Sequence, residues 1–93
     1  MDNQEEIHVD IKLSDDDMVG WLVYRPDTDE FLHSHREAHG YSTSAYVRNP
    51  SYAYRFNSAC LAFNFAKFMD KVVEVVPLYD LGDRFAVGFE RNN

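Results

Sequence analysis

The chain has 93 residues, of which 45% are hydrophobic and 15% aromatic, enough for one folded domain (residues 1–93) with a modest core. With 16 acidic against 9 basic side chains the formal net charge is −7, which disfavours direct binding to DNA or to an anionic membrane. The single cysteine, Cys60, excludes an intrachain disulfide and a cysteine-based zinc cluster.

The first predicted element is a strand over residues 6–13, where Ile7, Val9, Ile11 and Leu13 alternate with polar side chains. Three adjacent aspartates then form an acidic turn. A second strand, residues 18–25, is apolar on both faces, which predicts a central strand covered on two sides.

Residues 26–29 (PDTD) fit a turn with proline at its second position, and residues 30–35 are the expected hairpin partner of the central strand. The next segment, residues 36–51, reads either as a long irregular connection or as a weak edge strand.

A helix is predicted over residues 56–71, with Asn57 as its N-cap and a hydrophobic staple between Phe56 and Leu61. Helical periodicity places one apolar stripe on the sheet: Leu61, Ala62, Phe65, Phe68 and Met69.

Two more strands, residues 72–79 and 84–90, are joined by a turn at residues 80–83. The expected fold is therefore α+β, a mostly antiparallel sheet of about five strands with one α-helix packed on one face.

No motif of a catalytic family is present, so we expect a protein that is not an enzyme and has no cofactor. Two weaker alternatives stay open. His33, His35 and His39 suggest a metal site, and the Tyr- and Arg-rich residues 41–56 suggest stacking with a single-stranded nucleic acid.

The acidic residues are concentrated in one third of the chain. Residues 1–30 hold ten acidic and two basic side chains, whereas residues 31–93 hold six and seven. Solubility alone would not require this asymmetry, and the residues before and after the central strand are expected to form one negative surface. The predicted partner-binding residues are Glu5, Glu6, Asp10, Asp15, Asp16, Asp17, Asp27, Asp29 and Glu30.

Such a surface imitates the phosphates of DNA and predicts a non-enzymatic protein that occupies the DNA-binding surface of a partner protein. The competing interpretation is a protein-interaction module that uses Phe63 or the Tyr-rich segment, with acidity serving solubility. Phe63 falls on the polar side of the predicted helix beside Cys60 and Lys67, and these three residues are a candidate homodimer contact.

In length, acidity and element order the chain resembles the small early proteins of T-even-type phages, and among them the Arn-like anti-restriction DNA mimics. The segments "GWLVYRPDTDEFL" and "AYRFNSACLAF" also resemble a broader class of small phage and bacterial domains. The Arn-like resemblance implies a dimer that inhibits a modified-cytosine-dependent restriction nuclease in the host cytoplasm. It rests on no diagnostic motif, so no functional residue is transferred. The acidic start without a signal peptide, and the lack of a membrane-spanning apolar run, also predict a cytoplasmic protein.

Overall fold

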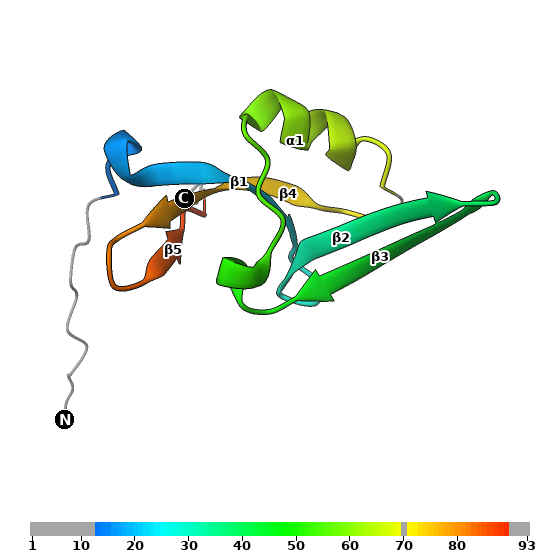
Figure 1. Ribbon diagram of the computed structural model, residues 1–93, viewed down its shortest axis with the longest axis horizontal. Coiled ribbons are helices and arrows are strands. Elements are labelled where there is room, and N and C mark those ends of the chain that lie inside the picture. The colour runs from blue at the N-terminus through cyan, green and yellow to red at the C-terminus, as the bar shows by residue number, and fades with distance from the viewer. Residues whose placement is uncertain (1–12, 70, 90–93) are drawn as a thin grey trace.

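The computed structural model describes residues 13–69 and 71–89. Within these residues one α-helix lies on a five-stranded antiparallel sheet with strand order β3-β2-β1-β4-β5 (Figure 1), which confirms the α+β prediction. The elements in chain order are the 3-10 turn η1 (Asp15–Asp17), β1 (Met18–Arg25), β2 (Glu30–Ala38), β3 (Tyr41–Val47), the 3-10 turn η2 (Pro50–Tyr52), α1 (Ala59–Ala66), β4 (Glu74–Asp80) and β5 (Phe85–Val87).

The five strands are not the five that the sequence pattern favoured. The predicted strand at residues 6–13 lies outside the described residues, apart from Leu13, which is not in a strand. The fifth strand is β3, taken from the segment at residues 36–51, so the edge-strand alternative for that segment is correct.

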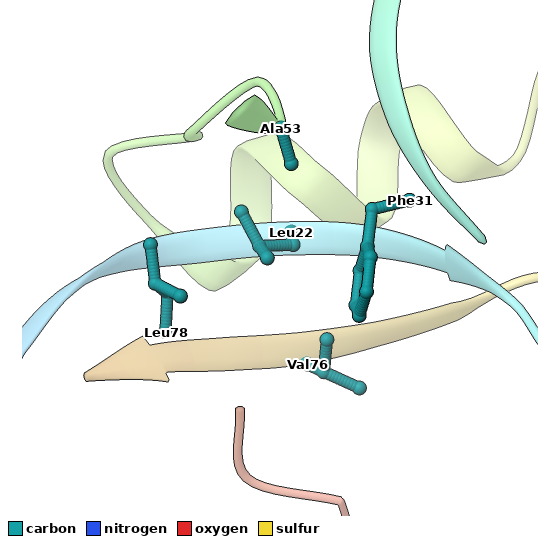
Figure 2. Packing of buried hydrophobic residues seen from close by; sticks show 5 residues of the cluster. All are labelled: Leu22, Phe31, Ala53, Val76 and Leu78. Atoms are coloured by element: carbon teal, nitrogen blue, oxygen red, sulfur yellow. The ribbon is translucent and has the colours of Figure 1, made fainter. Parts of the chain in front are cut away.

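Strand β1 is the centre of the sheet, as its two apolar faces predicted. On one face Leu22 packs with residues of the neighbouring strands and of the segment after η2: Phe31, Ala53, Val76 and Leu78 (Figure 2). On the other face Val23 packs with Leu32 of β2 and with Ala62 of α1. The core therefore has two layers that meet at β1.

Strands β2 and β3 form a hairpin that extends away from the rest of the sheet (Figure 1). The β1–β2 pairing covers only Tyr24 with Phe31 and Arg25 with Glu30. Beyond this point β2 pairs with β3 as far as its end. His39 and Gly40 close the hairpin with φ angles of 53° and 82°. A two-residue loop with two positive φ angles is the type I′ geometry, whose twist matches the flanking strands.

The N-cap of helix α1 lies one residue later than predicted, and the helix is shorter than the predicted segment. Its N-cap is Ser58, not Asn57, because the Ser58 Oγ accepts a hydrogen bond from the Leu61 N–H at 3.1 Å. The predicted staple is also wrong, since Phe56 packs against Phe65 with 5.6 Å between ring centroids, while Leu61 is 53% exposed.

The predicted apolar stripe of α1 is correct in part. Ala62, Phe65 and Met69 pack on the sheet, whereas Leu61 and Phe68 are exposed, Phe68 by 84%. The fully buried Ala62 has a small side chain, which lets the helix approach β1 closely along a narrow strip. Leu61 lies to the side of that strip, and Phe68 lies beyond the last helical residue, Ala66.

Candidate functional site

Five aspartates from two distant parts of the chain lie at one end of the sheet. η1 is capped by Ser14, whose Oγ accepts a hydrogen bond from the Asp16 N–H at 3.2 Å, and it places three carboxylates at the start of β1. Because Met18 pairs with Tyr79, the end of β4 lies beside this turn. Asp16, Asp17 and Asp80 line one surface hollow of about 470 Å³. We call this set the acidic end: Asp15, Asp16, Asp17, Asp80 and Asp83.

The carboxylates of the acidic end are largely uncompensated. Asp83 pairs with the adjacent Arg84 at 3.4 Å. Across residues 13–69 and 71–89, no other basic side chain forms an ion pair with the five aspartates. The Asp80 carboxylate instead accepts a hydrogen bond from the Gly82 N–H at 2.9 Å, which stabilises the turn into β5. The result is a concentrated negative field at the surface.

The second acidic group, Asp27, Asp29 and Glu30, lies at the opposite end of β1. An eight-residue strand rises about 3.3 Å per residue, so it separates the two groups by more than about 20 Å. The expectation that Asp15–Asp17 and this group lie close together is therefore wrong. The sequence pattern could not show this. The two acidic groups are close along the chain, but the extended strand β1 between them holds them far apart in space.

The side chains of this second group are partly engaged within the protein. Arg25 donates to Asp27 at 3.2 Å, and the Tyr24 hydroxyl donates to Asp29 at 2.7 Å. The shared hydrogen bond lowers the pKa of Asp27 and raises that of Arg25. Three further predicted partner-binding residues, Glu5, Glu6 and Asp10, lie outside the described residues.

The three histidines do not form a metal site. An irregularity in the β2–β3 pairing between Leu32 and Ser34 breaks the strand alternation. His33 then contacts the Tyr52 carbonyl with its Nδ1 at 2.8 Å, His35 packs on the ring of Phe65, and His39 lies in the hairpin turn. Within the described part of the chain, no three His, Cys, Asp or Glu side chains are placed to hold a metal ion.

His35 takes part in a hydrogen-bond chain that the sequence did not reveal. Its Nδ1 lies 2.8 Å from the Ser44 Oγ and its Nε2 lies 3.2 Å from the Glu37 carboxylate. The chain borders a cleft of about 550 Å³ between the hairpin and the end of α1, where Arg25 and Lys71 also lie.

The order of groups, hydroxyl, imidazole and carboxylate, is that of an acyl-transfer triad. However, the Glu37 side chain is 70% exposed, so water competes for its hydrogen bonds and it cannot fix the imidazole firmly. His35 and Ser44 are also direct partners in the β ladder, which accounts for their contact as an ordinary cross-strand pair. We therefore assign the hydrogen-bonded set of Ser44, His35 and Glu37 a structural role in the β2–β3 hairpin.

The Tyr- and Arg-rich segment uses part of its side chains inside the protein. Arg55 lies over the ring of Phe85 at 4.9 Å, and Tyr54 packs edge-on against Phe56 at 4.8 Å. Tyr46 is covered by the Arg25 guanidinium at 4.7 Å. These rings and arginines contact one another, an arrangement that leaves fewer of them free to stack on bases.

Phe63 is a surface residue, as the helical periodicity predicted. Its side chain is 54% exposed and borders an apolar hollow of about 410 Å³, together with Trp21, Val75, Pro77 and Tyr79 of the sheet. Cys60 is exposed on the same helix, and Lys67 is exposed at the C-cap of that helix.

Comparison with known proteins gives no relative: no protein-family model, no curated protein and no solved structure matches the chain. The resemblance to the Arn-like DNA mimics therefore stays a prediction. Among the described residues, no helix has both the length and the apolar character needed to cross a membrane.

Proposed function

We propose that this protein is a non-enzymatic inhibitor that imitates DNA and binds the DNA-binding surface of a host restriction or other defence nuclease. The observation that carries the proposal is the acidic end. Within the described residues, only one of its five aspartates forms an ion pair. Duplex DNA carries one negative charge per about 1.7 Å of axis, and proteins that bind it present matching Lys and Arg side chains. Clustered carboxylates attract the same cationic surface.

We restrict the proposed contact to the acidic end, which contains only part of the predicted partner-binding residues. Asp15, Asp16 and Asp17 remain in it, and Asp80 and Asp83 join them through the β1–β4 pairing. The group of Asp27, Asp29 and Glu30 lies at the other end of β1 and serves as a natural internal control, because it carries the same number of carboxylates as η1.

The proposal is tested by converting Asp15, Asp16 and Asp17 to asparagine and measuring how the protein inhibits DNA cleavage by a modified-cytosine-dependent restriction nuclease. Electrostatic steering acts mainly on association, so the variant should bind the nuclease more slowly. We expect the association rate, taken from the onset of inhibition, to fall about tenfold at low salt and less at high salt. The control converts Asp27, Asp29 and Glu30 to their amides and should change the rate less. Equal inhibition by the η1 variant and the parent at physiological salt would contradict the proposal.

A second candidate function rests on the exposed Phe63 and the hollow beside it. The protein is then an interaction module that captures an apolar side chain of a partner, and its acidity serves solubility. Replacing Phe63 with alanine should abolish partner capture from a bacterial lysate, while the η1 variant should capture the partner normally. Duplex DNA separates the two candidates, because it competes only with a partner held at its DNA-binding site.

A further inference from the structure

The cleft between the β2–β3 hairpin and the end of α1 has one apolar wall and one polar wall (Figure 1). The helix and the residues after it supply the apolar wall: Phe65, Phe68 and Met69. The strands supply the polar wall: Arg25, His35, Glu37, Ser42, Ser44 and Tyr46. The cleft volume of about 550 Å³ lies within the range of about 300–1,000 Å³ that is typical of small-molecule sites.

Two cations line this cleft, although the protein carries a net charge of −7. Among the described residues, the charged side chains of its lining are Arg25, Lys71 and Glu37. Glu37 is bonded to His35. Arg25 uses Nη2 for Asp27, whereas its buried Nε has no hydrogen-bond partner within the described residues, so Asp27 does not use all of its donors. The acidic end lies more than about 20 Å away along β1, beyond the screening length of about 8 Å at physiological salt, and repels an anion in the cleft only weakly.

The polar wall fits a phosphate group better than a carboxylate. Ser42 adds a hydroxyl to the cations of the cleft, whereas the Ser44 hydroxyl is already in contact with the His35 Nδ1 at 2.8 Å. A phosphate monoester has three acceptor oxygens and a charge of about −1.5 to −2 at pH 7, which matches an ammonium, a guanidinium and a hydroxyl. A carboxylate has only two oxygens and leaves one of these donor groups without a partner.

The apolar wall offers an aromatic ring on which a second ring can stack. Phe68 is 84% exposed and lies beyond the last residue of α1, so its ring is not used by the core. Phe65 stands edge-on to His35 with 5.1 Å between ring centroids, and it fixes the wall beside Phe68. Planar bases gain affinity by stacking on exposed phenyl rings of this kind.

We propose that this cleft binds a small phosphate monoester that carries a planar ring, of which a nucleoside monophosphate is a common example. The phosphate contacts Lys71, Arg25 and Ser42, and the ring stacks on Phe68. This site does not depend on the proposed inhibition, because it lies at the opposite end of β1 from the acidic end.

The first experiment titrates the full chain with adenosine 5′-monophosphate (AMP) and follows its backbone amides by NMR. We expect shifts concentrated in β2, β3 and residues 65–69 and 71, with a dissociation constant below about 1 mM. Adenosine and inorganic phosphate each supply one part of the ligand, and each should bind at least about tenfold more weakly than AMP. A chain that does not bind AMP would overturn the proposal. Binding of adenosine or of inorganic phosphate as tight as that of AMP would also overturn it, because the site would then recognise only one of the two parts.

The second experiment tests the two walls with pairs of exposed side chains. Lys71→Gln removes the ammonium from the cleft and should raise the dissociation constant of AMP about tenfold. Its control, Lys67→Gln, removes the same charge at the C-cap of α1, outside the cleft lining, and should change this constant less than about twofold. Phe68→Ala should also weaken AMP about tenfold but leave the binding of inorganic phosphate unchanged. Its control is Phe63→Ala, which removes an exposed phenylalanine from another hollow.

Circular dichroism checks that the four variants fold. AMP binding with the affinity of the parent in Lys71→Gln or in Phe68→Ala would overturn the assignment of that wall and with it the proposed ligand. The η1 asparagine variant should bind AMP as the parent does, and Lys71→Gln should inhibit as the parent does. A failure of the proposed inhibition and a failure of this site are therefore distinguishable.

Discussion

The Arg25 side chain is held by an aromatic ring and by a carboxylate. Its side chain is only 15% exposed, its guanidinium lies over the ring of Tyr46, and it donates to Asp27 at 3.2 Å. The ring holds the guanidinium in one place, so the carboxylate meets a positioned donor and loses less side-chain entropy on pairing. This accounts for the lowered pKa of Asp27, whose side chain is otherwise open to water.

The ion pair predicts how stability depends on pH. The folded pKa of Asp27 lies below its ordinary value of 3.8, so the pair stabilises the fold above that value and is lost as pH falls through the folded pKa. Asp27→Asn should therefore lower the free energy of unfolding near pH 7, and this loss should shrink at acidic pH, as measured by urea denaturation at pH 7 and at the lowest pH at which the parent stays folded. Asp83→Asn removes a fully surface pair and is the control with a smaller effect. An equal loss at both pH values would contradict the assignment.

Ser58 gives a second prediction at the same scale, because the sequence pattern favoured Asn57 as the cap. The Ser58 Oγ accepts the Leu61 N–H, an otherwise unpaired donor of the first helical turn. Ser58→Ala should cost about 1 kcal/mol of stability, and Asn57→Ala much less. Thermal unfolding of the two variants decides between the two caps. A larger loss of stability for Asn57→Ala would show that Asn57 is the N-cap.

At the scale of elements, the sequence predicts a strongly buried segment more accurately than an exposed one. β1 was predicted at its observed bounds because both faces are apolar and acidic and proline residues limit it. For β3 the sequence does not distinguish a strand from an irregular connection, because the outer half of β3 is exposed on both faces and no alternation of polar and apolar residues marks it. The helix was predicted too long because the apolar Phe68 continues the helical period although α1 ends at Ala66.

The turn of the β2–β3 hairpin provides the prediction at this scale. His39 and Gly40 both have positive φ, which glycine adopts freely, asparagine tolerates and histidine adopts less readily. Gly40→Ala should destabilise the hairpin by about 1 kcal/mol although open space surrounds the new methyl group, and His39→Asn should stabilise it by a few tenths. Hydrogen exchange of the β2 and β3 amides measures both effects. Opposite signs would show that the turn adopts another geometry.

At the scale of the whole molecule, the fold redistributes the charge that the sequence concentrates in residues 1–30. β1 carries the chain away from Asp17, so the charge of Asp27 to Glu30 arrives at the other end of the strand. The end of β4, in contrast, places Asp80 beside the start of β1, although Asp80 lies more than sixty residues after Asp17 in the sequence. The sequence predicted the charge asymmetry, whereas Asp80 and Asp83 were missed because their place depends on the β1–β4 register.

This redistribution predicts that the acidic end lowers the stability of the fold. Its five carboxylates repel one another across a small surface. Within the described residues, a single ion pair compensates part of this charge. Asp16→Asn or Asp80→Asn should therefore raise the free energy of unfolding by a few tenths of a kcal/mol at low salt, and by less at about 1 M salt, where the screening length is about 3 Å. Asp29→Asn also removes one charge, but from a carboxylate that accepts the Tyr24 hydroxyl, so it should give no gain. Denaturation of the three variants at both salt concentrations makes the comparison. A loss of stability at Asp16 or Asp80 would mean that these carboxylates serve the fold, whereas a gain is what a surface kept for binding at the expense of stability requires.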